Sequence, residues 1–96
     1  MESLLRSEWS HAFERLMRNR LLVGRYRYGR MDREHDTDYD RVTSILRRLH
    51  EYQQHGNMEH LVDIANLCMM EFEHTAHDKA HFDASDDADH VRKRSA

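Results

Sequence analysis

The stretch VTSILRRLHEYQQHGNMEHLVDIANLCMMEF, residues 42–72, decides the fold of this 96-residue chain. His55-Gly56-Asn57 divides the stretch, because glycine can adopt the left-handed conformation that ends one helix and asparagine can cap the next. Apolar residues recur at three- and four-residue spacing on both sides of this break, as in amphipathic helices. Because the link is so short, the two helices should lie antiparallel. The stretch therefore predicts an all-α fold built on a helical hairpin.

The two helices of the predicted hairpin each carry an apolar stripe. The earlier helix should be capped by Thr37, with Asp40 at its third helical position. Its apolar face comprises Val42, Ile45, Leu46, Leu49 and Tyr52, and its polar face Arg41, Arg47, Arg48, His50 and Glu51. The later helix, from about Met58 to His74, carries a stripe of Leu61, Ile64, Ala65, Cys68 and Phe72, with Val62 and Met69 at its edge. We expect these stripes to be buried, with Cys68 as a filler.

A third helix is predicted ahead of the hairpin, from about Ser3 to Val23, with Gly24 as its stop. The alternation of arginine and tyrosine over residues 25–28 then favours a loop. After about Thr75 the chain is polar, and it should either hang free or dock through Phe82 alone. These expectations give a three-helix arrangement, with a single helical domain over residues 1–75 and a flexible tail over residues 76–96.

The composition is that of a small globular protein, with 39% hydrophobic and 34% charged residues. It is too apolar for a disordered chain and too polar for a membrane protein. No apolar run approaches the roughly 20 residues that span a bilayer, and Glu2 stands where a signal peptide would be positive. A single cysteine excludes a disulfide scaffold. We expect a cytoplasmic protein with no membrane partner and, since so short a chain has a thin core, a homo-oligomer.

Charge is distributed unevenly along the chain, although the formal net charge is only −3. Residues 6–33 contain eight arginines and three acidic residues, whereas residues 57–96 contain nine acidic and four basic residues. Guanidinium groups bind phosphate or carboxylate bidentately, and tyrosine rings can stack on bases. The candidate anion-binding residues are Arg18, Arg20, Arg25, Tyr26, Arg27, Tyr28 and Arg30. The alternative is that these arginines pair with the acidic helix at residues 58–74, in the same chain or in a second copy.

Two sets of side chains could hold a metal. Glu59, Asp63 and Asn66 fall on one line of their helix, so that their oxygens could converge on a divalent cation; otherwise they form its solvated face. A second set would align if the helix continued and could bind zinc, or it could simply be solvated. Its members are Glu71, His74, His77 and His81. We predict no catalytic residue, because neither Ser10 nor Ser44 lies in a recognisable nucleophile arrangement.

The segment Gly56-Asn57-Met58-Glu59-His60-Leu61-Val62-Asp63-Ile64-Ala65-Asn66, with Glu71-Phe72 and residues 80–84 (AHFDA), resembles a group of small uncharacterised proteins from bacteriophages and actinobacteria. The resemblance covers residues 40–88. It implies an accessory role in a phage or mobile element.

The chain is also similar, more weakly, to the MazG-like all-α nucleotide pyrophosphohydrolases. That family binds magnesium through a Glu-x-x-Glu pair on one helix and a Glu-x-x-Asp pair on the next. Glu59 and Asp63 correspond to the second pair but are four residues apart, and Glu51 stands alone where the first pair would be. The resemblance implies a metal-dependent hydrolase with Mg²⁺ as cofactor.

These observations favour a phage-type helical binding protein that contacts an anionic partner and modulates a host process. The partner would be a nucleic acid, a nucleotide or an acidic surface of a host protein, and no cofactor is expected. Two alternatives remain open at this point: a divergent MazG-like pyrophosphohydrolase that uses Mg²⁺, and a structural assembly protein.

Overall fold

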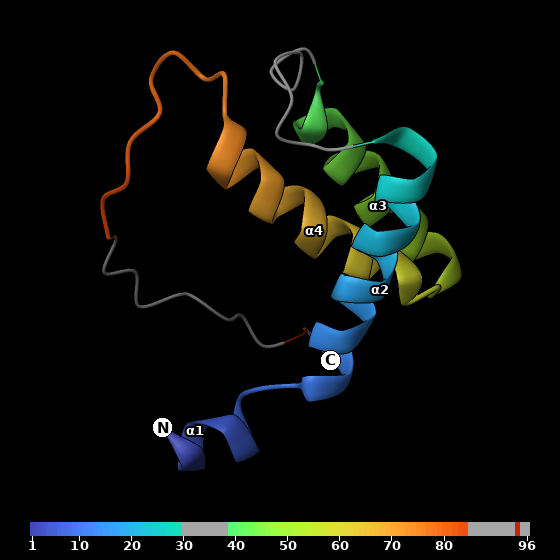
Figure 1. The fold of residues 1–96 in the computed structure, drawn as a ribbon, viewed down its shortest axis with the longest axis vertical. Coiled ribbons are helices and arrows are strands. Elements are labelled where there is room, and N and C mark those ends of the chain that lie inside the picture. Colours follow the sequence, from blue (N-terminus) through green and yellow to red (C-terminus); the bar gives the residue numbers. More distant parts are fainter. Residues whose placement is uncertain (30–38, 85–93, 95–96) are drawn as a thin grey trace.

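The computed structural model describes residues 1–29, 39–84 and 94. Within these residues the chain forms four α-helices and no strand (Figure 1). The helices are α1 (Glu2–Ser7), α2 (His11–Tyr28), α3 (Arg41–His55) and α4 (Glu59–His74). The prediction of an all-α fold is confirmed.

Helices α2 and α3 pack against α4. The antiparallel partner of α4 is α3, and α2 packs against α4 from another side, while the short helix α1 lies apart near the N-terminus (Figure 1). None of the described helices combines the length and the apolar character that crossing a membrane would require. The hairpin of α3 and α4, joined by a short link, is therefore the framework on which α2 is placed.

The turn of the hairpin has the predicted chemistry. Gly56 adopts φ 71° and ψ 15°, and its N–H donates to the carbonyl oxygen of Tyr52 at 2.8 Å. The Asn57 side-chain oxygen accepts from the Glu59 N–H at 3.1 Å. The left-handed glycine thus ends α3 as expected. The N-cap of α4 is Met58 rather than Asn57, although the Asn57 side chain, one residue earlier, accepts from the first residue of the helix.

The N-terminal part differs from the prediction of one helix over residues 3–23. Helix α1 already ends at Ser7. A new helix begins after Ser10, whose hydroxyl accepts from the Phe13 N–H at 3.1 Å and so caps it. That helix, α2, continues through Gly24 and residues 25–28, which were expected to be a stop and a loop. A single glycine inside a helix costs only about 1 kcal/mol relative to alanine, which an 18-residue helix can absorb. The helix ends at Gly29, where φ is 81°.

The start of α3 also differs in detail. Asp40 is the N-cap rather than the third helical residue, and it accepts hydrogen bonds from the Thr43 N–H at 3.1 Å and the Thr43 hydroxyl at 2.7 Å. These bonds, the one from the hydroxyl first, hold the pKa of Asp40 below its ordinary value because they stabilise the carboxylate. Thr37, the expected cap, lies outside the described residues.

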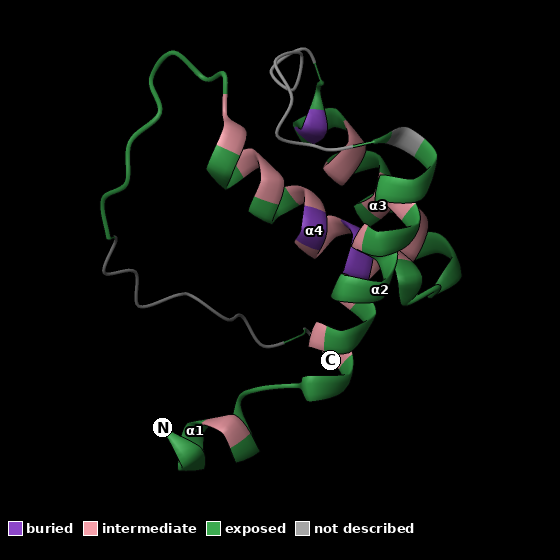
Figure 2. Ribbon diagram, in the orientation of Figure 1, coloured by how far each residue is buried: buried purple, intermediate pink, exposed green. Residues whose placement is uncertain are grey.

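Most of the buried residues are polar, and the predicted apolar stripes are less buried than expected. Among the described residues Val62 is the only buried hydrophobic one, and it is accompanied by Arg41, Asp63 and Asn66 (Figure 2). The stripe on α3 lies largely on the surface: Val42, Leu46 and Leu49 are exposed, and Ile45 and Tyr52 are half-buried. On α4, Cys68 and Phe72 are exposed as well. The expected burial of the α3 stripe is thus largely wrong. On α4 the expectation holds in part, because Leu61, Ile64 and Ala65 are half-buried and Val62 is buried. Paired polar groups lie between the helices as well.

The residues after α4 leave the helical conformation at Thr75. The ring of Phe82 meets the ring of Phe72 edge to face, with centroids 6.4 Å apart. Of the two expectations for this segment, docking through Phe82 agrees with that contact, although Phe82 itself stays exposed. The remainder of the predicted tail, apart from residue 94, lies outside the described residues.

Candidate anion-binding site

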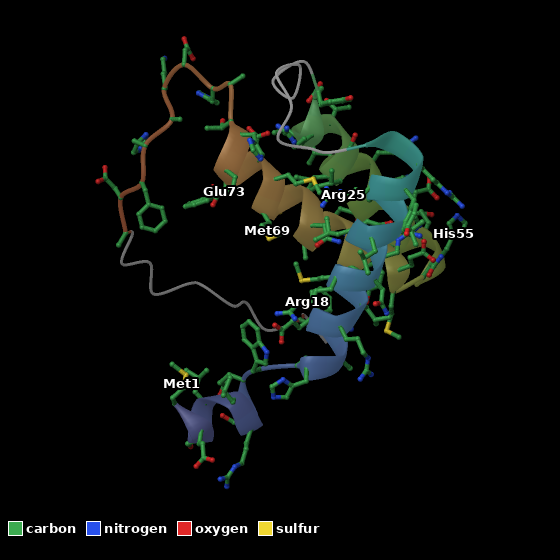
Figure 3. All side chains as sticks on the ribbon, viewed as in Figure 1. Met1, Arg18, Arg25, His55, Met69 and Glu73 are labelled. Atoms are coloured by element: carbon green, nitrogen blue, oxygen red, sulfur yellow. The ribbon has the colours of Figure 1, made fainter. Side chains whose placement is uncertain are left out.

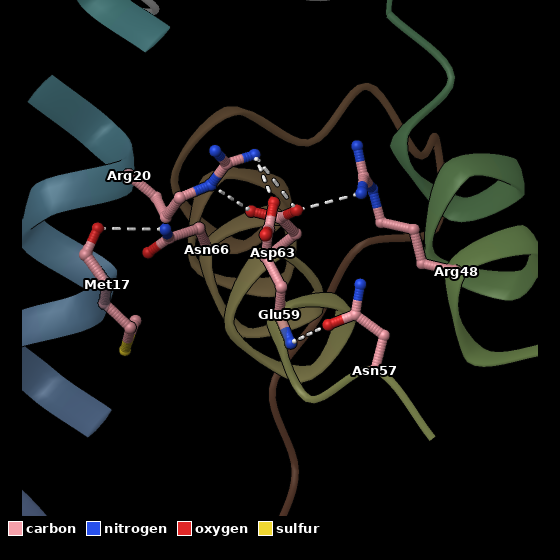
Figure 4. Close-up of polar contacts among 7 residues, drawn as sticks. All are labelled: Met17, Arg20, Arg48, Asn57, Glu59, Asp63 and Asn66. Atoms are coloured by element: carbon pink, nitrogen blue, oxygen red, sulfur yellow. Dashed lines mark hydrogen bonds and ion pairs between the residues drawn. The ribbon is translucent and has the colours of Figure 1, made fainter. Parts of the chain in front are cut away.

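The side chain of Asp63 joins three helices (Figure 4). From α2, Arg20 donates through Nε at 3.1 Å and through Nη2 at 3.4 Å, and from α3, Arg48 donates through Nη1 at 2.9 Å. Only 9% of Asp63 is exposed. Hydrogen bonds between ionised groups at such distances are among the stronger polar contacts in proteins. This carboxylate therefore fixes how α2 and α3 sit against α4.

Two neighbours of Asp63 on α4, Glu59 and Asn66, also make polar contacts with α2. We call the contacts of Glu59, Asp63 and Asn66 with the other helices the polar seam. Glu59 forms an ion pair with Nη2 of Arg20 at 3.2 Å, and the side-chain amide of Asn66 donates to the carbonyl oxygen of Met17 at 3.0 Å. Glu59, Asp63 and Asn66 share one line as predicted, but Asp63 and Asn66 are buried against other helices. The alternative that this line is simply the solvated face of the helix is therefore wrong.

The same contacts bear on the two predicted metal sets. Both oxygens of Asp63 already accept from arginine, so this carboxylate does not fit the Mg²⁺ site of a MazG-like enzyme. In the second set, α4 ends at His74, and Glu71 accepts from Arg41 at 3.2 Å and from Thr75 at 2.9 Å. No group of three or more His, Cys, Asp or Glu residues in the described part of the chain is placed to hold a metal ion.

Beside the seam lies an open pocket of about 750 Å³ between α2, α3 and α4. Its polar lining comes from Arg20, Arg25 and Arg27 on α2, Arg48 on α3, and Asp63, Asn66 and His74 on α4. Leu21, Val23, Leu67 and Met70 supply apolar surface, and Gly24 leaves room on the α2 side. A methyl group built at Gly24 would meet nothing within 4 Å. Size and mixed lining are those of a site for a small molecule.

The pocket is strongly positive. Four arginines and one aspartate line it, and the aspartate is shared by Arg20 and Arg48. Arg25 and Arg27 are exposed, and neither forms an ion pair with any residue that the structure describes. Their charges are left to be balanced by solvent ions or by a ligand.

The predicted anion-binding set divides in the structure. Arg20, Arg25 and Arg27 meet at the pocket, whereas Arg18 lies elsewhere along α2 and pairs with Glu14 at 2.9 Å (Figure 3). Tyr26 is exposed and does not line the pocket. The side chain of Tyr28 and the whole of Arg30 lie outside the described part. For Arg20, the alternative of pairing with the acidic helix of the same chain is confirmed.

Two residues of the pocket were missed. Arg48 had been assigned to the solvated face of its helix, and His74 to a zinc set. The only signal that could have placed Arg48 inward is the excess of carboxylates on the facing helix, which would draw arginines of any neighbour toward it.

Comparison of the chain with protein-family models, with curated proteins and with solved structures finds no match.

Proposed function

We propose that this chain is a small helical binding protein that holds a phosphate-bearing nucleotide unit in the arginine-lined pocket. One observation carries the proposal: Arg25 and Arg27 form no ion pair with the described part of the chain, and they line a pocket whose other two arginines are held in place by Asp63. Arg20 and Arg48, which Asp63 already holds in place, would lose little freedom on binding, and this favours affinity.

The size and lining of the pocket support one class of anionic partner over the others. A volume of about 750 Å³ suits a compact ligand, whereas an acidic protein surface would be met by a flatter and wider patch. Guanidinium groups match the oxygens of a phosphate, and the surface of Leu67 and Met70 suits the apolar faces of a base or sugar. A nucleotide, free or at the end of a strand, combines both features.

The pocket favours binding over covalent chemistry. Among the described residues that line it, none is a serine, threonine or cysteine that could act as a nucleophile. The pyrophosphohydrolase and assembly alternatives, and a phage accessory role, stay predictions; release of pyrophosphate from nucleoside triphosphates with Mg²⁺ would test the first of them.

The test compares ATP binding by the parent chain with binding by a variant that combines Arg25→Ala and Arg27→Ala. Each lost charge-assisted contact costs roughly 1.5–3 kcal/mol, so the affinity should fall by about a hundredfold or more. The matched control combines Arg15→Ala with Arg47→Ala, which removes two exposed arginines that do not line the pocket. The control should keep its affinity, and both variants should keep their helix content.

Two further probes separate the sources of the anion. A single-stranded oligonucleotide should bind with an affinity that falls as salt is added, and the fall should be less steep in the pocket variant. A polyglutamate peptide should bind far more weakly than ATP. Equal ATP affinity in the parent chain and the pocket variant, or preference for polyglutamate, would overturn the proposal.

A further inference from the structure

The side of α2 that faces away from α4 carries a basic and aromatic patch. The half-buried residues of α2 mark the side that packs, and they are Phe13, Glu14, Met17, Leu21 and Gly24. Away from that side, Leu22 is 58% exposed. Residues three and four positions away are its neighbours on the helix surface, and all four are exposed: Arg18, Asn19, Arg25 and Tyr26. We call Leu22 and these four neighbours the α2 patch.

The patch lies on a strongly basic helix. Helix α2 contains five arginines, and its one acidic residue, Glu14, pairs with Arg18 at 2.9 Å. Arg25 forms no ion pair with any residue in the described part of the chain. A helix surface with this excess of guanidinium groups attracts polyanions, and it does so along its length rather than at one point.

Tyr26 adds an aromatic surface to this charge. It is 92% exposed, and its side chain makes no hydrogen bond, ion pair or ring contact with the residues that the structure describes. Proteins that bind single strands combine basic side chains for the phosphates with aromatic rings on which bases stack. In a duplex the faces of the bases are already stacked on one another. The pairing of arginine with an open tyrosine therefore fits a single strand.

We propose that the α2 patch binds a nucleic-acid single strand whose terminal nucleotide lies in the arginine-lined pocket. Arg25 belongs to both surfaces, because it lines the pocket and is also a surface neighbour of Leu22. A strand that leaves the pocket past Arg25 would reach the ring of Tyr26, and its next phosphates would meet Arg18. The inference rests on the proposed function, and it selects the end of a strand over a free nucleotide.

An anionic membrane surface fits α2 less well. A helix that lies on a membrane carries its apolar residues on one face. On α2, Leu16 and Val23 are 49% and 41% exposed, but they lie about a third of a turn from Leu22, with Asn19 between them. The exposed apolar residues are thus divided between two sides of the helix.

Fluorescence anisotropy with a labelled single-stranded oligonucleotide of thymidines tests the patch, with ATP binding measured in parallel. Tyr26→Ala should weaken oligonucleotide binding about fivefold or more, the contribution of one stacked base, and change ATP affinity by less than about twofold, because Tyr26 does not line the pocket. Tyr26→Phe should bind like the parent chain, since it keeps the ring. Phe82→Ala is the matched control: Phe82 is also aromatic and 83% exposed, but lies outside α2.

The outcomes separate this inference from the proposed function. If ATP binds but the oligonucleotide binds no more tightly than ATP, or if Tyr26→Ala leaves oligonucleotide affinity unchanged, the patch is refuted and the pocket stands. If oligonucleotide binding depends on Tyr26 while ATP does not bind, the pocket is refuted and the patch is confirmed as a strand-binding surface by itself. Tighter binding to phosphatidylserine vesicles than to the oligonucleotide would also overturn the inference.

Discussion

Replacing Asp63 by alanine should destabilise the fold far more than removing a surface carboxylate. The substitution removes three hydrogen bonds from Arg20 and Arg48 and the counter-ion that the two guanidinium groups share, while Arg20 keeps its ion pair with Glu59. A fully buried pair broken in this way costs about 3–5 kcal/mol. Here 41% of Arg20 and 29% of Arg48 remain exposed, so water compensates in part and we expect about 2–4 kcal/mol. For a domain of this size that corresponds to a fall in Tm of about 10–30 °C.

Urea unfolding followed by far-ultraviolet circular dichroism measures this cost. The protein concentration must be held fixed, because self-association would shift the apparent stability. Glu14→Ala is the matched control: Glu14 also receives an arginine at 2.9 Å, from Arg18, but on an exposed stretch of α2. Such surface pairs contribute about 0.5 kcal/mol or less. If Asp63→Ala costs no more than Glu14→Ala, the seam does not hold the helices together.

A double-mutant cycle locates the effect in the ion pair itself. Arg48→Met alone should also destabilise, because it leaves Asp63 with fewer donors. The combined variant should cost less than the two single variants together by about 1 kcal/mol or more, since removing both partners leaves no unpaired charge. Strict additivity would show that Arg48 and Asp63 act independently.

Two smaller predictions concern the ends and the middle of helices. Gly24→Ala should raise the free energy of unfolding by about 0.5–1 kcal/mol in thermal melts, because the position is helical and open; a loss of stability would contradict the helix through residue 24. Hydrogen bonds from Thr43 lower the pKa of Asp40 below 3.8, so its charge stabilises the folded state above that pH, and this contribution is lost as the pH falls through the lowered pKa. The stability advantage over Asp40→Asn should therefore shrink on acidification below pH 3.8, and an advantage constant with pH would refute this.

The sequence predicts the hairpin well because its determinants are local. Gly56 takes a backbone conformation that suits glycine, and the Asn57 side chain accepts a hydrogen bond from Glu59, the first residue of the next helix. The expected limits of α4, residues 58–74, agree with Glu59–His74. Gly24 shows the limit of the same logic: a glycine ends a helix only where the backbone turns left-handed, and in α2 that happens at Gly29.

The buried faces could not be predicted from periodicity. The spacing of apolar residues identifies the helix face whose burial would be most favourable. In this fold, ion pairs between residues 15–43 positions apart determine which helix faces contact each other. Arg41 is only 3% exposed and pairs with Glu71, although it stood on the predicted polar face. The candidate site was half predictable for the same reason: the arginines of α2 follow from composition, whereas Arg48 joins them only through the fold.

Net charge explains why the polar sides of these helices meet. Five arginines and one glutamate lie on α2, three arginines and one glutamate on α3, and four carboxylates without a single lysine or arginine on α4. Two basic helices therefore pack against one acidic helix, and each pairing is favourable over the whole length of contact as well as at single bonds. Ion pairs fix direction and register more than they add stability. Val42, Leu46 and Leu49 of the α3 stripe are thereby left on the surface. Of the arginines of α2 that form no ion pair with a described residue, Arg25 and Arg27 line the pocket, and they are the basis of the proposed anion site.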